Sequence, residues 1–126
     1  MQLHKYASSM LHLNRDNSFL TEFSGDWARE AHVKERPLEF GKKTIDTKLG
    51  ARANMFCSTF FQLSLDGKSE ENKGEVLVGT SGWTGNFRFV FEVDNKNERR
   101  VISGINPYAS EYSLKPNEIF LSLIHI

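Results

Sequence analysis

FRFVFEVDNKN, residues 87–97, is the clearest structural signal in the chain. Its apolar residues recur at every second position: Phe87, Phe89, Phe91 and Val93. Successive side chains of a strand point to opposite faces, so this spacing predicts a half-buried β-strand. The polar residues 94–97, DNKN, are typical of a tight turn between two strands. We therefore expect a β-hairpin at this position.

Runs that alternate in the same way, or that are rich in β-branched residues, occur on both sides of this hairpin. We expect further strands at residues 61–65, 75–80, 101–105 and 119–123, and less regular ones at 9–13, 19–23 and 44–48. Short sequences rich in Gly, Asn and Asp separate these runs. Strands joined by short turns predict an all-β fold, here an antiparallel β-sandwich.

Residues 27–36 allow two interpretations. Trp27 and Ala31 lie four residues apart, and Asp26 could cap a short helix there. Ala31, Val33 and Glu35 also alternate with basic residues, which is typical of a strand. We expect a strand or an extended loop, ended in either case by Pro37.

The composition is that of one small globular domain. The 126 residues are 39% hydrophobic and 25% charged, and Lys plus Arg equals Asp plus Glu at 16 each. Zero net charge gives no electrostatic footprint for nucleic acid or an anionic membrane, so we expect neither as a partner. The basic pairs Lys42–Lys43 and Arg99–Arg100 are expected to be solvated surface.

Cys57 is the single cysteine, so an internal disulfide is impossible. A lone cysteine fits a reducing compartment. No apolar run has the length of a membrane span, and residues 1–5, MQLHK, lack the layout of a signal peptide. We expect a cytoplasmic protein.

The chain shows no pattern typical of a catalytic or metal site. Its acidic residues fall mostly in hydrophilic turns, where they are usually solvated. No pair of them has a pattern typical of general acid–base catalysis. The histidines are scattered, without the close spacing of metal ligands: His4, His12, His32 and His125. We expect no catalytic residue, no metal and no cofactor.

Two clusters place a tryptophan beside glycine and polar residues: residues 25–38 around Trp27, and residues 83–87 with Trp83, followed later by residues 104–108. An indole can stack on the apolar face of a sugar while Arg, Asp and Asn bond its hydroxyl groups. The alternative is that both tryptophans pack under loops as core. Composition alone favours packing, because tryptophan is highly buried on average.

The same clusters carry a resemblance. Residues 25–38, GDWAREAHVKERPL, are similar to the family 36 α-galactosidase pattern of a Gly-x-Trp-x-Arg-Glu core followed by Glu-Arg-Pro-Leu. Further matches follow in the order of that family, at residues 50–54, 74–76, 84–87, 104–108 and 114–120. Residues 3–120 therefore resemble the N-terminal β-supersandwich domain of glycoside hydrolase family 36.

The resemblance implies an enzyme that releases terminal α-D-galactose from oligosaccharides such as raffinose and melibiose, with retention. The catalytic aspartates of such enzymes lie in a following (β/α)8 barrel, so this chain alone is expected to be inactive. The implied partners are α-galactoside oligosaccharides, the barrel domain and further copies in a homo-oligomer. A stand-alone carbohydrate-binding β-sandwich, and a purely structural or oligomerisation domain, remain alternatives.

The resemblance also assigns roles to residues. Trp27 corresponds to a tryptophan of the family's substrate pocket, whereas Trp83 is expected to be structural. A charge network, structural or interdomain, is expected for Arg29, Glu30, Glu35 and Arg36. Gly25 is expected to adopt an unusual backbone angle that lets Trp27 project from the sandwich.

The ends depart from the family pattern. Residues 1–126 are expected to form one partial domain, the C-terminal portion of the N-terminal β-sandwich domain of an α-galactosidase. Residues 121–126, LSLIHI, resemble translated sequencing-adaptor read-through, and we expect them to be a non-native tail of a truncated reading frame.

Overall fold

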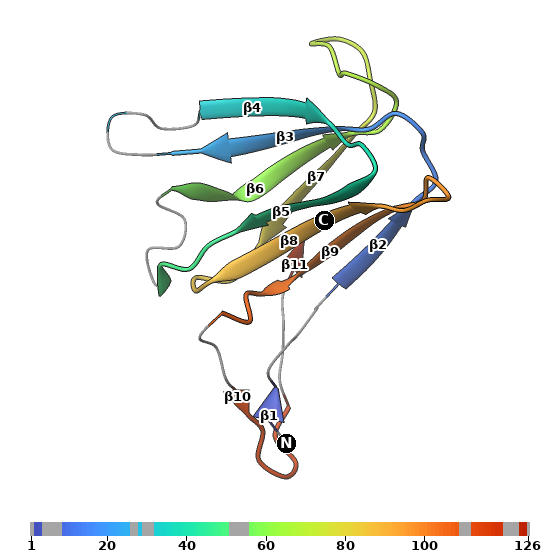
Figure 1. The fold of residues 1–126 in the computed structure, drawn as a ribbon. Helices are drawn as coiled ribbons and strands as arrows, with labels where there is room; N and C mark the ends of the chain where they lie inside the picture. Colours follow the sequence, from blue (N-terminus) through green and yellow to red (C-terminus); the bar gives the residue numbers. More distant parts are fainter. Residues whose placement is uncertain are drawn as a thin grey trace.

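Strands are the named elements of the computed structural model, which describes residues 2–3, 9–25, 28, 32–50, 56–108, 112–119 and 124–125 (Figure 1). The elements in chain order are β1 (Gln2–Leu3), β2 (Ser9–Leu13), β3 (Phe19–Ser24), β4 (His32–Pro37), β5 (Gly41–Asp46), β6 (Cys57–Ser64), β7 (Val76–Ser81), β8 (Phe87–Val93), β9 (Arg99–Ile105), β10 (Tyr112–Ser113) and β11 (Ile124–His125). The expectation of an all-β fold is confirmed, and β4 resolves the ambiguity of residues 32–36 in favour of a strand.

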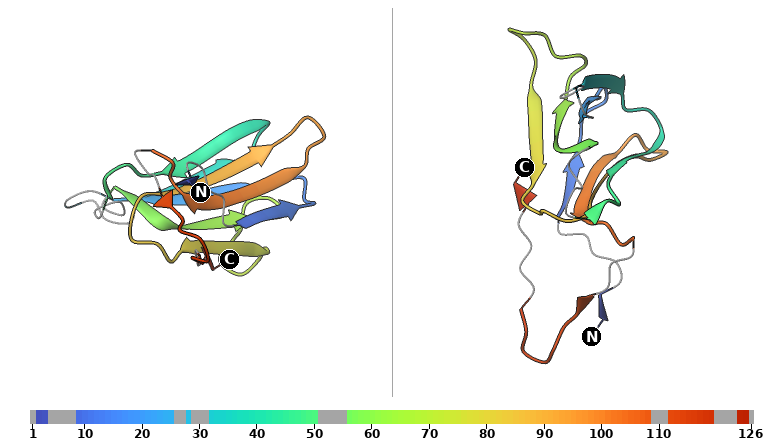
Figure 2. Two further views of the ribbon diagram at one scale, coloured as in Figure 1. Left: turned by 90° about the horizontal axis from the view of Figure 1, so that it is seen from below. Right: turned by 90° about the vertical axis from the view of Figure 1, so that its left-hand side faces the viewer.

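The strands form two main sheets, in which the named strands pair antiparallel. One sheet has the order β11-β7-β6-β3-β4 and the other the order β2-β9-β8-β5, while β1 and β10 form a separate pair. Figures 1 and 2 show the two main sheets as two layers, with β1 and β10 set apart from both. This arrangement is the predicted antiparallel β-sandwich.

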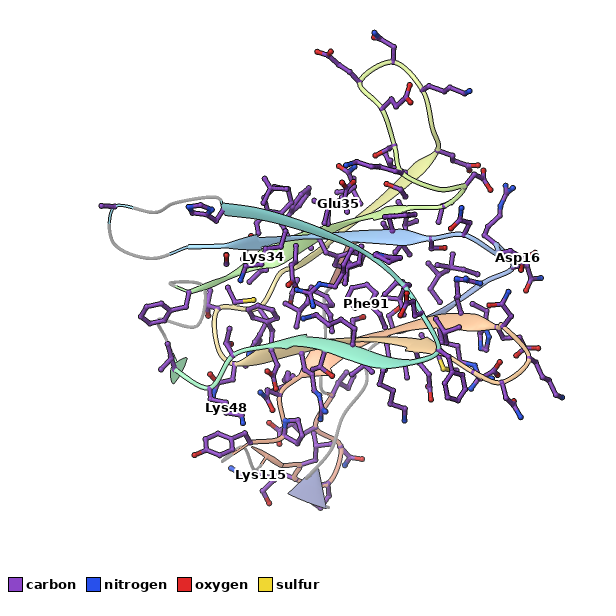
Figure 3. All side chains as sticks on the ribbon, turned by 45° about the horizontal axis from the view of Figure 1, so that its top comes forward. Asp16, Lys34, Glu35, Lys48, Phe91 and Lys115 are labelled. Atoms are coloured by element: carbon purple, nitrogen blue, oxygen red, sulfur yellow. The ribbon has the colours of Figure 1, made fainter. Side chains whose placement is uncertain are left out.

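The predicted hairpin is formed by β8 and β9 at the centre of the four-stranded sheet. Its inward positions are the alternating apolar residues of β8, with Phe89 opposite Ser103 and Phe91 opposite Val101. Figure 3 shows the Phe91 side chain between the two sheets. The alternation of residues 87–93 thus predicts both the strand and the face that it buries.

Asp94 organises the turn of this hairpin. Its Oδ1 accepts hydrogen bonds from the backbone N–H groups of Lys96 (2.9 Å) and Glu98 (3.0 Å), and Asn97 takes a positive φ of 63°. Its Oδ2 pairs with Arg100 at 3.0 Å. Desolvation opposes ionisation, yet the two backbone hydrogen bonds and Arg100 hold the pKa of Asp94 below its ordinary value.

Phe61 joins the two sheets. Its side chain is fully buried, and its ring packs edge-on against Phe89 and Phe91 at centroid distances of 5.0 and 4.9 Å. Gly79 of β7 lies opposite Phe61 in the register, and a Cβ at that position would come within 2.3 Å of the ring. The glycine therefore makes room for the ring that connects the sheets.

The expectation of solvated surface is wrong for Arg99 and holds only in part for Lys43, whose side chain is half-buried. Arg99 is only 4% exposed, because its terminal nitrogens donate to the backbone oxygens of Asn97 (3.1 Å) and Asp16 (2.5 Å). Lys43 pairs at 3.3 Å with Glu22 of the opposite sheet. Long basic side chains can bury their stems when a nearby oxygen satisfies the charged end.

The strand expected at residues 119–123 is not found where the structure describes that segment. Ile119 is 87% exposed and outside any strand, while residues 121 and 123 lie outside the described residues. The short strand β11 follows and pairs with Ser81 and Thr80 of β7. In the part of the chain that the structure describes, no helix has the length and hydropathy of a membrane span.

Candidate functional site

The loops that carry most of the family-like sequences meet at one end of the sandwich. Strands β3, β5, β7 and β9 end there, and β4, β6 and β8 begin there, because each pair is antiparallel (Figure 1). We call this the motif end, formed by the described residues 25, 28, 47–50, 56, 82–86 and 106–108. Segments far apart in the sequence are brought together by the strand pairing.

Trp27 itself lies outside the residues that the structure describes, and so do Asp26, Arg29 and Glu30. The described residues beside it belong to the motif end. Gly25 donates its backbone N–H to the oxygen of Phe56 at 3.1 Å, and the backbone of Ala28 has a φ of 62°. The unusual backbone angle expected at Gly25 is not found, because Gly25 is not among the described glycines with positive φ.

Asn106 ties three segments of the motif end together. Its side chain is almost fully buried, and its Nδ2 donates to the backbone oxygen of Thr47 (2.8 Å) and to Oδ2 of Asp46 (3.3 Å). Its Oδ1 accepts from the backbone N–H of Tyr108 at 3.0 Å, and its own backbone N–H donates to the oxygen of Asn86. The sequence alone assigns no role to Asn106, although its Gly-Ile-Asn-Pro context is a signal that marks it.

Asn86 adds a fourth connection. Its Oδ1 accepts a hydrogen bond of 2.7 Å from the backbone N–H of Gly50, which has a positive φ of 65°. Glycine tolerates that backbone angle without the steric cost that a Cβ would add. The two asparagines thus hold the loops after β5, β7 and β9 in one arrangement, which gives the motif end a rigid base.

Trp83 lies on the surface of the motif end and is 44% exposed. Its indole rests on Gly85, where a Cβ would come within 2.7 Å of Nε1. Leu49, Phe56 and Tyr108 are also exposed there, and Nζ of Lys48 lies 5.0 Å from the centre of the Tyr108 ring. Trp83 is therefore not a buried core residue, although its contact with Gly85 covers part of the ring.

Exposed aromatic rings beside amides and backbone groups can stack on a sugar and bond its hydroxyl groups. Within the described ranges, His, Cys, Asp and Glu form no group of three or more that could hold a metal ion.

Comparison with known families matches residues 1–115 to the glycosyl hydrolase family 36 N-terminal domain. The chain belongs to this family. The resemblance seen in the motif sequences is thereby confirmed over most of the chain.

Two relatives show how much of a longer protein this family 36 domain represents. The chain is 28% identical over 120 residues to Alpha-galactosidase 2 of Hypocrea jecorina, covering 95% of this chain and 16% of the relative. The crystal structure of the GH36 alpha-galactosidase AgaA from Geobacillus stearothermophilus matches with a TM-score of 0.88 and 28% identity, over 98% of this chain and 17% of that chain. Structures of AgaA variants are complexes with stachyose and with raffinose. The chain thus spans about a sixth of the length of these relatives.

The family 36 domain also contains a charge network between its sheets, close to the motif end. Glu22 of β3 is 13% exposed at its side chain and pairs with Arg36 of β4 (2.9 Å) and Lys43 of β5 (3.3 Å). Glu35 pairs with Lys68 at 2.7 Å on the other face of β4. Glu35 and Arg36 are thus both ion-paired, but with different partners on opposite faces of β4, while Arg29 and Glu30 lie outside the described residues.

Cys57 begins β6 next to this network. Burial raises the pKa of its thiol above the ordinary value, and Glu22 and Asp46 raise it further, although Lys43 and Lys34 act in the opposite sense. The thiolate is the reactive form of cysteine, so a raised pKa keeps this side chain unreactive at neutral pH. In this family 36 domain Cys57 packs against the core.

Proposed function

We propose that this chain is the non-catalytic N-terminal part of a retaining α-galactosidase that hydrolyses terminal α-D-galactose from oligosaccharides. The observation that carries the proposal is the gathering of family-like sequences at one end of a family 36 N-terminal domain. The names of the relatives and the stachyose and raffinose complexes of AgaA support this substrate class.

In this proposal the chemistry belongs to another part of the enzyme. Retaining glycosidases need two carboxyl groups about 5–5.5 Å apart, one as nucleophile and one as acid and base. A (β/α)8 barrel would supply them, and the motif end would form part of the wall of the pocket. We further propose that the complete enzyme is a cytoplasmic homo-oligomer.

Trp27 is the residue of this chain that we assign to the substrate. Its indole would stack on the galactose ring and close one side of the pocket. It would take no part in proton transfer, because an indole N–H is only a hydrogen-bond donor. Such a contact contributes equally to ground-state and transition-state binding unless it tightens during the reaction.

The test uses the enzyme encoded by the complete gene, after sequencing downstream of codon 126 for a barrel with paired aspartates. We expect Trp27→Ala to raise KM more than it lowers kcat, at a cost of about 1–3 kcal/mol, the scale of aromatic stacking on nucleic-acid bases. Phe40→Ala is the matched control, since Phe40 is 77% exposed at the opposite end of the sandwich. It should leave KM unchanged.

A different pattern would show that Trp27 is a packing residue. Truncation of a buried tryptophan costs about 3–5 kcal/mol of stability. An unchanged KM together with a collapsed melting temperature in Trp27→Ala would therefore refute the substrate role. A downstream sequence without a barrel would refute the proposed enzyme as a whole.

A further inference from the structure

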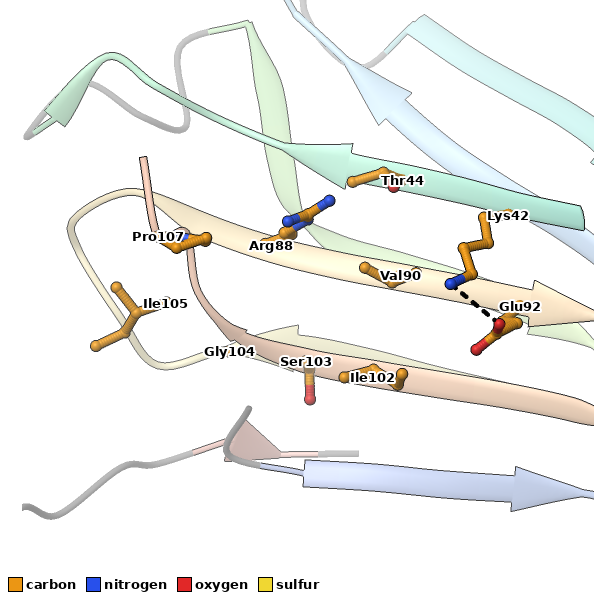
Figure 4. Close-up of a pocket in the computed structure, with 10 residues that line it drawn as sticks. All are labelled: Lys42, Thr44, Arg88, Val90, Glu92, Ile102, Ser103, Gly104, Ile105 and Pro107. Atoms are coloured by element: carbon orange, nitrogen blue, oxygen red, sulfur yellow. Dashed lines mark ion pairs between the residues drawn. The ribbon is translucent and has the colours of Figure 1, made fainter. Parts of the chain in front are cut away.

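A pocket of about 200 Å³ opens on the outer face of the four-stranded sheet, away from the core (Figure 4). Val90 of β8 and Ile102 of β9 are opposite each other in the register and give it an apolar floor. Arg88 lines one end, and at the other end Lys42 pairs with Glu92 at 3.2 Å. The pocket therefore combines an apolar centre with two charged ends, of which one is already neutralised.

The charge of Arg88, at the first end of the pocket, is not neutralised. None of its guanidinium nitrogens has a hydrogen-bond or ion-pair partner among the described residues, and its Nε is cut off from solvent. Arg99 and Arg100 also have an unpartnered Nε, but their terminal nitrogens are bonded. Among the described arginines, Arg88 is thus the one whose guanidinium nitrogens all lack a partner.

The nearest carboxylate in the register does not satisfy Arg88. Asp46 lies opposite it on β5, but the pair is not within the 4.0 Å of an ion pair. Oδ2 of Asp46 instead accepts the hydrogen bond from Asn106. In Figure 4 the end of the Arg88 side chain points toward β5 and Thr44, into the pocket.

We propose that this pocket binds a carboxylate carried on a short aliphatic chain, with Arg88 as its ligand. A guanidinium matches a carboxylate with two parallel hydrogen bonds, and neither Asp46 nor Glu92 competes for it. The aliphatic part would lie on Val90 and Ile102. The volume of about 200 Å³ is enough for a four- or five-carbon acid or a glutamate side chain.

This site also accounts for a sequence that the proposed function leaves unexplained. Within residues 104–107, Asn106 is a structural link, whereas Gly104, Ile105 and Pro107 line the pocket. Gly104 stands opposite Arg88 in the register. Gly104 has no side chain, so it adds no side-chain atoms to the β9 side of the pocket at the Arg88 end.

The test follows the Nε–H resonance of each arginine by NMR in the isotope-labelled 126-residue chain, at constant ionic strength. Sodium butyrate should shift the Arg88 signal saturably, with a Kd of about 1–10 mM. 1-Butanol, which has the same carbon chain without the charge, should not. A capped Gly-Glu-Gly peptide forms the second arm: binding of both probes identifies the carboxylate itself, and binding of the peptide alone identifies a protein segment as its source.

Matched variants separate this site from general anion attraction. Arg88→Gln should weaken butyrate binding at least about tenfold. Arg88→Lys keeps the charge but loses the two parallel N–H donors of the guanidinium, and it should weaken binding less. Arg15→Gln should retain full affinity, because Arg15 is an exposed arginine paired with Asp66 and Glu75 elsewhere. Unsaturable shifts of equal size at Arg15 and Arg88, or undiminished binding by Arg88→Gln, would overturn the proposal.

Discussion

Asn106 is a single buried side chain on which the arrangement of the motif end depends. Asn106→Ala would leave the oxygen of Thr47 and the N–H of Tyr108 without their partners. Each buried polar group that loses its partner costs about 1–3 kcal/mol, so we expect the free energy of unfolding to fall by at least that amount. Urea denaturation measures it, with Asn95→Ala in the exposed hairpin turn as a near-neutral control. Equal effects of the two variants would contradict the role of Asn106.

Asp94 makes the stability of the β8–β9 turn depend on pH. Its pKa is lower in the folded chain than the ordinary value of 3.8, so ionised Asp94 stabilises the fold above that pH. The contribution is lost as the pH falls through the lower, folded-state pKa. Asp94→Asn, which removes the charge facing Arg100, should therefore lower the melting temperature at pH 7, and the difference from wild type should shrink in acid below pH 3.8.

The control for this experiment is Glu71→Gln, which removes the same charge from an exposed turn. It should change the melting temperature little, because exposed charges contribute little to stability. If the difference in melting temperature between wild type and Asp94→Asn stayed constant from neutral pH into acid, it would contradict the role of ionised Asp94.

At the scale of the elements, the pairing of β6 and β7 depends on a glycine beneath an aromatic ring. Gly79→Ala would push a methyl group into Phe61, which cannot move because it packs on Phe89 and Phe91. Overpacking costs about 1–3 kcal/mol, more than the 0.4–1 kcal/mol typically gained by replacing a glycine. We expect a net loss of stability on chemical denaturation.

A double mutant tests the cause of this loss. Phe61→Leu removes part of the ring, so Gly79→Ala should cost less in a Phe61→Leu background than in the wild type. The coupling of neighbouring residues is what a double-mutant cycle measures. Strictly additive effects would show that the glycine serves another purpose.

At the scale of the whole molecule, the proposed function gives the sandwich a binding role and places catalysis in another domain. The 126-residue chain should therefore not hydrolyse p-nitrophenyl α-galactoside, because retaining hydrolysis needs two placed carboxyl groups. AgaA assayed in parallel provides the positive control. Turnover by the purified chain that disappears when Glu22 is changed to Gln would place the chemistry in this domain after all, since Glu22 is the inward carboxylate of the inter-sheet network.

Most of the fold could be predicted from patterns along the chain. The alternation of residues 87–93 marks a strand and its buried face, and residues 94–97 mark the turn, because both properties depend on near neighbours. Ile119 was misleading, since an apolar residue is free to lie on the surface where no sheet covers it. The family could also be predicted, since its motif sequences follow one another in a set order.

The partners of polar side chains required the tertiary structure. Arg99 binds the backbone of Asp16, 83 residues away, and Asn106 binds that of Thr47, 59 residues away. The unpartnered guanidinium of Arg88 likewise became visible only once strand pairing had placed β5, β8 and β9 side by side. Periodicity and turn composition are local, whereas the satisfaction of a buried charge or amide depends on which distant segments the sheets bring together.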